Sequence, residues 1–179
     1  MPHGFSSDRR PLASRLALVI LSLALAACER VPESSPMPVQ RPAPDASDPN
    51  SFLVRFSDHD ANEYVVRDIQ QNGNWAFDHP EMKFPIQARA GLRFTMQFSI
   101  PTDTFKDTGP VTVTVKINDH QLGSERCEHA GSYIFERPIP LDWLPSGEPV
   151  HVLAEATPLW TAEDGAHLGY LLEEAGFHW

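Results

Sequence analysis

The sequence predicts an all-β domain over residues 51–179, an antiparallel β-sandwich of jelly-roll or immunoglobulin-like type with about eight to nine strands. Two segments, Leu92–Ile100 and Val111–Ile117, alternate apolar and polar residues, as half-buried strands do. Turn-forming residues separate these and several weaker segments of strand length. Nine of the 17 prolines lie in this region, which disfavours long helices.

Both strong segments have one apolar face. In LRFTMQFSI (Leu92–Ile100) and VTVTVKI (Val111–Ile117) every second residue is apolar, so one face of each strand is expected in the core. Gly91 and Pro101 punctuate the first segment, and Pro110 precedes the second. Weaker patterns predict further strands at 52–56, 63–69, 74–77, 83–88, 121–127, 132–138 and 150–156.

The segment at 161–176 fits two structures. Thr161 suits the start of a helix and Gly176 suits its end. Gly165 and Gly169 would then lie in the helix interior, where each costs about 1 kcal/mol relative to alanine. The same stretch also contains apolar residues that alternate as in a strand, namely Leu168, Tyr170 and Leu172. The residue pattern alone leaves helix and strand open.

The first 27 residues have the pattern of an export signal. Arg9, Arg10 and Arg15 form a basic region, and the uncharged apolar run Leu16–Ala27 follows it. This run is short, because a membrane-spanning helix needs about 20 apolar residues. We therefore expect a signal peptide over residues 1–27.

The end of this run resembles the lipobox of bacterial lipoproteins. Leu25-Ala26-Ala27-Cys28 (LAAC) is the matching motif, and the resemblance implies cleavage before Cys28 and lipidation of its sulfur and amine. Several acyl chains anchor a protein stably. Glu29 follows the cysteine, where the family often has aspartate for inner-membrane retention, so the outer membrane is favoured over the inner one, on its periplasmic or surface face. The alternative is an ordinary secretory signal that contains a cysteine.

A proline-rich linker is expected between the lipidated cysteine and the sandwich, over residues 28–50. The stretch 29–50 holds six of the 17 prolines and no hydrophobic periodicity. Such a segment buries too little apolar surface to fold. Fully extended it would reach about 60 to 70 Å, so we expect a disordered tether that holds the domain away from the membrane.

Four stretches of the domain resemble an uncharacterised bacterial β-sandwich module. They are Ile100–Val113, Cys127–Phe135, Pro138–Leu144 and Asp164–Tyr170, and the likeness covers most of residues 83–178. Similar modules occur alone in secreted or anchored proteins, or appended to glycosyltransferases and other cell-surface polysaccharide enzymes. The resemblance implies a closing strand from about Leu168, and it carries no catalytic residues. The family hairpin usually has Asn-Gly where this chain has Asn118-Asp119.

Charge and cysteine content exclude several classes of protein. The net charge of -10 argues against nucleic acid as a partner. Two cysteines do not make a disulfide scaffold, and with Cys28 lipidated, Cys127 is left as a lone thiol. The sequence contains no phosphate-binding loop, no Gly-x-Ser-x-Gly motif and no His-Glu-x-x-His motif. Carboxylates that could pair as in a glycosidase are abundant, but their positions in sequence do not single out a pair. We therefore expect a non-enzymatic protein with no cofactor.

Candidate ligand-binding residues lie near the start of the domain. Trp75 follows the turn-rich Asn72-Gly73-Asn74 and is the best candidate for an aromatic platform on which a sugar ring stacks. Asp58, Asp60 and Asn62 have the spacing that begins a calcium loop. The glycine of such a loop is replaced by Glu63, so a solvated turn is the favoured interpretation and no metal site is predicted.

A second metal hypothesis concerns Cys127 and His129, with His120 across the hairpin. A buried cysteine without a metal is the favoured alternative.

Together these features predict an envelope lipoprotein with a non-catalytic β-sandwich that recognises carbohydrate or cell-surface polysaccharide. Its expected partners are the membrane, through the lipid anchor, and a polysaccharide or an envelope protein. One alternative is a protein-interaction or structural module of an envelope assembly, docking through a sheet edge. A small hydrolase on a jelly roll is the third and least supported alternative.

Overall fold

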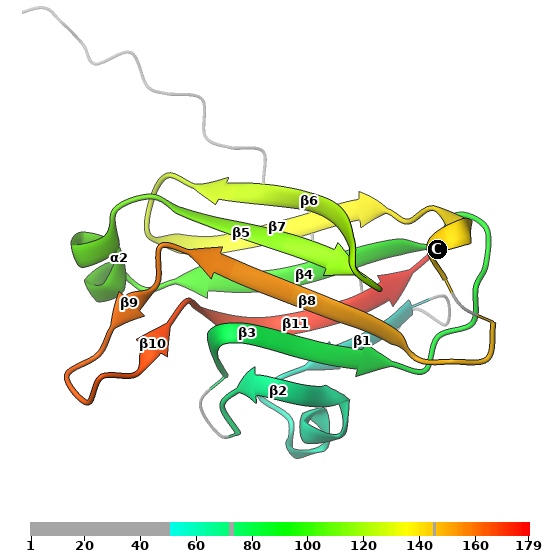
Figure 1. Cartoon of the computed structure of the whole chain (residues 1–179), viewed down its shortest axis with the longest axis horizontal. Coiled ribbons are helices and arrows are strands. Elements are labelled where there is room, and N and C mark those ends of the chain that lie inside the picture. The colour runs from blue at the N-terminus through cyan, green and yellow to red at the C-terminus, as the bar shows by residue number, and fades with distance from the viewer. Residues whose placement is uncertain (1–50, 72–73, 145) are drawn as a thin grey trace, which may run out of the picture. The chain divides into compact units, whose positions relative to one another are not determined.

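The computed structural model describes residues 51–71, 74–144 and 146–179 (Figure 1). The predicted signal peptide, the lipidation of Cys28 and the linker lie outside these residues. The described chain forms a nine-stranded antiparallel sheet and a separate two-stranded ribbon. The predicted all-β sandwich is therefore confirmed.

The elements follow one another with short connections. The strands of the large sheet are β1 (Ser51–Arg55), β2 (Val65–Ile69), β3 (Trp75–Phe84), β4 (Arg93–Ile100), β5 (Val111–Ile117), β6 (His120–Cys127), β7 (Gly131–Pro138), β8 (Val150–Thr157) and β11 (Tyr170–His178). The ribbon pairs β9 (Trp160–Thr161) with β10 (His167–Leu168). The helices are α2 (Thr102–Thr108) and the 3₁₀ helices η1 (His59–Tyr64) and η2 (Leu141–Trp143). In the described part of the chain, no helix is long and apolar enough to cross a membrane.

The sheet folds over on itself to make two layers. Its strand order is β6-β5-β8-β3-β11-β4-β7, with β2 paired to β3 and β1 paired to β11. Among the described residues, strand pairing joins the layer β6-β5-β8-β3-β2 to the layer β1-β11-β4-β7 at two residue pairs, Tyr170 with Ala76 and Leu171 with Trp75. Figure 1 shows β5 and β8 side by side over β4 and β11. This short junction lets one sheet form both layers of a sandwich.

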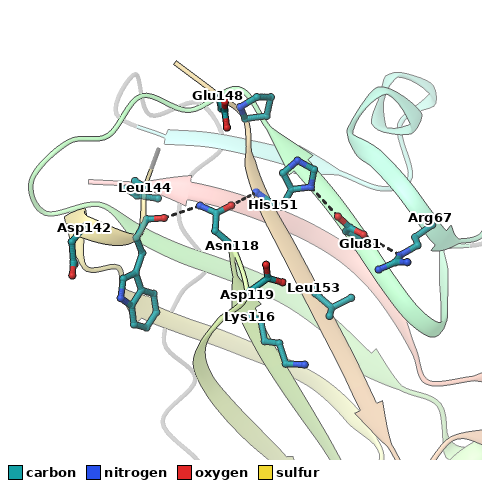
Figure 2. Close-up of a pocket in the computed structure, with 12 residues that line it drawn as sticks. Arg67, Glu81, Lys116, Asn118, Asp119, Asp142, Leu144, Glu148, His151 and Leu153 are labelled. Atoms are coloured by element: carbon teal, nitrogen blue, oxygen red, sulfur yellow. Dashed lines mark hydrogen bonds and ion pairs between the residues drawn. The ribbon is translucent and has the colours of Figure 1, made fainter. Parts of the chain in front are cut away.

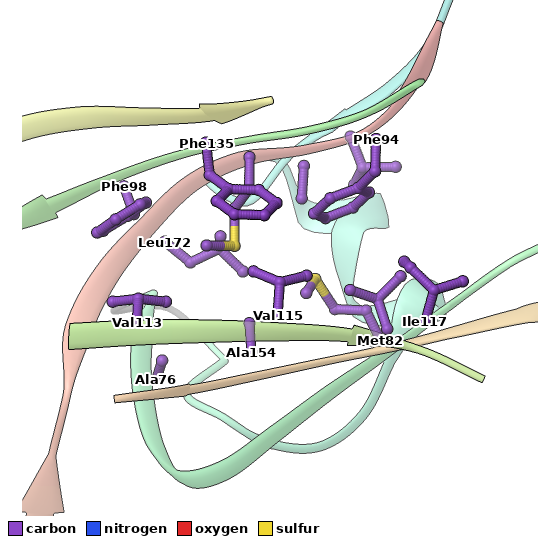
Figure 3. Close-up of a cluster of buried hydrophobic side chains, with 14 of the residues drawn as sticks. Ala76, Met82, Phe94, Phe98, Val113, Val115, Ile117, Phe135, Ala154 and Leu172 are labelled. Carbon is purple, nitrogen blue, oxygen red and sulfur yellow. The ribbon is translucent and has the colours of Figure 1, made fainter. Parts of the chain in front are cut away.

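The core lies between the two layers (Figure 3). Phe94, Phe98 and Phe135 come from β4 and β7, and they face Val113 and Val115 from β5. All five side chains are fully buried. The alternation read from the sequence therefore assigns the inward face of these strands correctly.

β3 differs from the sequence prediction. Two strands were expected, at 74–77 and 83–88, but one strand runs from Trp75 to Phe84 and includes Pro80. The pairing of β2 with β3 is irregular between Arg67 and Ile69, and pairing with β8 begins only at Glu81. Pro80 therefore lies where no regular ladder requires its missing N–H. The predicted start of the second strand at Glu63 is also wrong, because Glu63 belongs to η1.

The short helix α2 was not predicted. Pro101 precedes it, Asp103 lies in its first turn, and Gly109 with φ of 68° ends it. At the C-terminal end of this helix, the Gly109 N–H donates a hydrogen bond to the Phe105 carbonyl. These signals were present in the sequence, but seven residues are too few to show helical periodicity.

The hairpin and the C-terminal segment agree with the sequence prediction. Asn118 and Asp119 both have positive φ, of 45° and 69°, which is the type I′ turn that a two-residue hairpin prefers. Residues 161–176 form no helix, and the strand interpretation is confirmed by β10 and β11. Gly165, with φ of 85°, lies in the turn between β9 and β10.

Strand β11 organises the sheet. It pairs with β4 along most of its length, with β1 from Glu174 to His178, and with β3 at Tyr170 and Leu171. Gly176 lies opposite Leu53 of β1, and a Cβ there would approach the Phe52 carbonyl oxygen to 2.0 Å. The two strands can pair at this point because residue 176 has no side chain.

Candidate functional site

A cavity of about 600 Å³ opens on the outer face of the layer β6-β5-β8-β3-β2 (Figure 2). Its residues come from β2, β3, β5 and β8, from the β5–β6 turn and from the segment around η2. They combine one aromatic ring with several hydrogen-bonding side chains. The central ones are Arg67, Glu81, Lys116, Asn118, Trp143 and His151.

The same alternation that builds the core aims polar side chains into this cavity. On β5, Val115 and Ile117 are buried, so Lys116 between them points outward. On β8, Val150 and Val152 are buried, so His151 points outward. Because β5 and β8 are paired neighbours, the outward residues of both strands reach one surface.

Asn118 fixes one end of the cavity. Its side-chain amide donates to the Trp143 carbonyl at 2.8 Å, and its amide oxygen accepts from the His151 backbone N–H at 2.9 Å. Its own backbone N–H donates to the His151 carbonyl at 3.0 Å. One residue thus ties the β5–β6 turn to β8 and to η2, which holds the cavity walls in place.

A chain of hydrogen bonds and ion pairs continues across the sheet from this point. His151 Nδ1 lies 2.8 Å from Glu81 Oε1, and Arg67 Nε lies 3.0 Å from Glu81 Oε2. Figure 2 shows this chain running from Asn118 through His151 and Glu81 to Arg67. The Glu81 carboxylate therefore holds two side chains that face the cavity.

A second cavity, of about 520 Å³, lies on the same sheet. Glu155 of β8 is its central carboxylate, accepting from Lys116 Nζ at 2.8 Å and lying 2.7 Å from His79 Nδ1. The hydrogen bond from Lys116 and that from His79 hold the pKa of Glu155 below its usual value, against the effect of partial burial. Glu155 is therefore ionised at neutral pH.

The rim of the first cavity carries carboxylates of another kind. Asp119, Asp142 and Glu148 are exposed and line it. Among the described residues none of the three makes a hydrogen bond or ion pair. The cationic side chains of this cavity, by contrast, are engaged with Glu81 and Glu155. The unengaged charge offered to a ligand is therefore negative.

Trp143 supplies the aromatic surface of the first cavity. Its ring stacks on His120, with centroids 4.8 Å apart and planes inclined by 15°. The side chain is half-buried and packs against the edge of the core. Trp143 therefore both packs against the core and lines the cavity.

The two histidine–glutamate pairs lack a nucleophile. His79 with Glu155 and His151 with Glu81 have the geometry in which a carboxylate orients an imidazole. Within residues 51–71, 74–144 and 146–179, no serine, threonine or cysteine side chain hydrogen-bonds to either imidazole. Nucleophilic catalysis of the triad type needs such a contact.

Trp75, the predicted aromatic platform, lies at the start of β3. Its side chain is half-buried, its partner on β11 is Leu171, and it lines neither cavity. Its role in binding stays a prediction that is separate from the two cavities.

The predicted oxygen cluster lies on an exposed turn at η1. Asp58 precedes the helix and accepts from the Ser57 hydroxyl, and the Asn62 amide donates to the His59 carbonyl at 3.3 Å. Asp60 lies in the first turn. Over the described ranges, no group of three or more histidine, cysteine or acidic side chains has a metal-binding arrangement.

The residues of the second metal hypothesis serve other contacts. Cys127 is a free, buried thiol whose pKa is raised to about 12, mainly by burial and also by Glu125. His120 stacks on Trp143. His129 is exposed, and its backbone exchanges hydrogen bonds with the Tyr133 hydroxyl.

The sequence prediction missed most of the residues that form the cavities. Lys116 and His151 were visible as the outward positions of predicted strands, but nothing local showed that β5 and β8 are neighbours. Arg67 and Glu81 belong to strands whose limits were predicted only in part. The available sequence signal is a polar residue at an outward position of a strand. This signal identifies a shared site only when the order of the strands in the sheet is known.

Comparisons with known proteins give no family for this chain. No protein-family model matches it, and no curated protein matches it. Similar solved structures include the acetyl xylan esterase Est2A from the rumen bacterium Butyrivibrio proteoclasticus, with 11% identity and a TM-score of 0.42. The similarity covers 72% of this chain and 32% of that one.

Two further solved structures have similar values. Dimeric latent PorU from Porphyromonas gingivalis has 10% identity and a TM-score of 0.39, over 72% of this chain and 13% of that chain. The CBM36-1 domain of a multidomain xylanase from the hindgut metagenome of Trinervitermes trinervoides has 15% identity and a TM-score of 0.37, over 71% and 97% of the two chains. At this level of similarity, none of the three identifies a ligand or an activity of this chain.

Proposed function

We propose that this protein is a lipid-anchored envelope protein whose β-sandwich binds a glycan without catalysing a reaction. The observation that carries the binding role is the cavity on the outer face, where one aromatic ring lies beside fixed hydrogen-bonding groups. Sugars present hydroxyl groups and apolar ring faces together, and a site with both kinds of surface is complementary to them. Asn118 and Glu81 hold the cavity walls before a ligand arrives, which reduces the entropic cost of binding.

The charge of the cavity favours neutral or amine-bearing glycans. Asp119, Asp142 and Glu148 present carboxylates that no described side chain neutralises, so they would accept hydrogen bonds from hydroxyl or ammonium groups. An anionic glycan would meet these carboxylates and the net charge of -10. Polyanionic polysaccharides are therefore disfavoured.

The absence of catalysis is part of the proposal. Neither the His79 nor the His151 imidazole has a hydroxyl or thiol partner among the described residues. These two imidazoles lie instead against Glu155 and Glu81, carboxylates that also engage Lys116 and Arg67. This arrangement suits fixed hydrogen-bonding groups for a ligand better than a proton-transfer site.

Trp143→Ala is expected to weaken glycan binding by about tenfold, which corresponds to about 1.4 kcal/mol. The chain, purified in detergent from the cells that produce it, is screened on an array of neutral, amine-bearing and acidic oligosaccharides, and affinities are measured by calorimetry. Asp119→Asn is a second variant, because asparagine readily adopts positive φ and only the charge is removed. It should lower affinity for amine-bearing glycans and leave the fold intact.

Trp160→Ala is the matched control. Trp160 is also half-buried, donates from Nε1 to Asp107 and lines neither cavity, so its loss should not change affinity. Trp75→Ala distinguishes the two aromatic candidates: loss of binding in that variant alone would move the site to Trp75. Failure of the unsubstituted chain to bind any glycan on the array would contradict the proposed function.

Cys28→Ala is expected to release the protein from the membrane fraction and to abolish palmitate labelling. The resemblance of Leu25–Cys28 to a lipobox supports this, since the cysteine thiol is the acylated group. Cys127→Ala is the control and should keep the label, because the Cys127 thiol is buried. Continued labelling of the Cys28→Ala chain would contradict a lipid anchor at this residue.

A further inference from the structure

The two cavities of the outer face share a residue. Lys116 of β5 lines both of them. Successive outward residues of β8 divide between the cavities: His151 and Leu153 line the first, and Glu155 and Thr157 line the second. On β3, Glu81 lines the first cavity and His79 the second. The cavities therefore follow each other along the same strands.

The combined length of the two cavities suits a chain of several sugars and not a single sugar. Positions 151 and 157 of β8 are six residues apart, which at about 3.3 Å per residue is about 20 Å. β8 lies between β5 and β3, so both sides of this path have a strand that contributes lining residues (Figure 1). The path is longer than one sugar ring.

An ion pair lies at the boundary between the two cavities. Lys116 and Glu155 join across it, and their side chains are 34% and 26% exposed, so both are largely covered by their neighbours. The ammonium and carboxylate neutralise each other at 2.8 Å. The two charges at the boundary are therefore paired, and neither side chain is fully exposed between the first cavity and the second.

Both cavities offer hydrogen-bonding groups of the same kinds. The first has Asn118 and His151, and the second has Gln121, Thr114 and His167. A polymer with repeating hydroxyl groups would find partners at intervals along the whole path. A single sugar would use only one part of it.

We infer that the two cavities form one continuous groove that binds an internal segment of a linear glycan, several sugar units long, lying along β8. This inference rests on the proposed glycan-binding function and adds the class of ligand: an extended chain, recognised within its length and not at its end. Lys116 lines both cavities, so it lies at the middle of the groove and contacts the sugar units on both sides of the boundary.

The test is a length series measured by calorimetry with the full chain in detergent. The probes are linear β-1,4-linked oligomers of glucose, mannose and N-acetylglucosamine, each with two to six units. Affinity is expected to rise with length by at least about tenfold and then to level off once the ligand spans both cavities. An oligosaccharide that is chemically blocked at both ends should bind as well as an unblocked one.

Variants of the second cavity test its share in binding. His167→Ala should lower affinity for the six-unit oligomer about fivefold and leave the two-unit oligomer unaffected. Gln121→Ala, on the opposite wall, should act in the same way, and it leaves the β9–β10 ribbon intact. His129→Ala is the matched control, because this exposed histidine lines neither cavity.

The outcomes separate the two proposals. Equal affinity at every length, with no effect of His167→Ala or Gln121→Ala, would overturn the continuous groove and leave the glycan-binding function standing. A requirement for a free chain end would also overturn it. Failure of all three series to bind at any length would overturn the glycan-binding function, and the groove with it.

Discussion

Gly176→Ala is expected to lower the free energy of unfolding by about 3 kcal/mol. A Cβ at this position would lie 2.0 Å from the Phe52 carbonyl oxygen and 2.9 Å from the Leu53 Cα. Both atoms belong to the backbone of β1, so no side-chain rotation relieves the overlap. The change must push β1 away from β11 along the register that pairs Leu53 with residue 176. Urea unfolding of the two chains measures the effect.

Gly123→Ala is the matched control for this prediction. Gly123 is also a strand glycine, in β6, and a Cβ there would meet the Phe135 ring at 3.4 Å, an ordinary van der Waals contact. The free energy of unfolding of the Gly123→Ala variant should stay within about 0.5 kcal/mol of that of the unsubstituted chain. Faster amide exchange along β1 in Gly176→Ala would show that the strain is released there. Equal stability of both variants would contradict the close approach of β1 and β11.

Phe84→Ala is expected to cost about 3 to 5 kcal/mol of stability. The Phe84 side chain is fully buried, and its ring lies 5.3 Å from Phe177 of β11 in edge-to-face geometry. It also contacts Phe52 of β1 and Tyr64 of η1, with ring centroids 6.4 Å and 6.0 Å away. Removing this ring leaves a cavity where three segments meet, and loses aromatic contacts with each.

Phe105→Ala provides the comparison, since this residue packs against the core from α2 but is only half-buried. Its truncation should cost less than half as much, because less apolar surface is transferred to water. Calorimetric or urea unfolding of both variants gives the ratio of the two losses in unfolding free energy. Similar losses for the two phenylalanines would mean that Phe84 does not join β3 to β11 in the way described.

Local patterns predicted the strands well, and the physical reason is the two-residue period of a pleated strand. The inward faces of β4 and β5 follow directly from their sequences, because alternation needs no knowledge of other strands. The failures are also local. The pattern predicts two strands, at 74–77 and 83–88, where one strand runs through Pro80, because the irregular pairing of β2 and β3 accommodates this residue. Helix α2 is too short to show a period.

The candidate site could not be predicted in the same way, because its contacts are distant in sequence. Lys116 and Glu155 are 39 residues apart, His79 and Glu155 are 76 apart, and His151 and Glu81 are 70 apart. These pairs meet only because β8 lies between β5 and β3. That order is set by the packing of the whole sheet, and no short stretch of sequence encodes it.

The central place of β11 has a consequence for the order in which the protein folds. Tyr170–His178 is made after all the other strands, yet it joins β1, β3 and β4. A nascent chain that stops before Tyr170 therefore has two half-sheets with no strand to connect them, and their apolar faces stay open. The two layers can therefore close over the core only after β11 has been made, so the last step of folding depends on contacts between strands that are far apart in sequence.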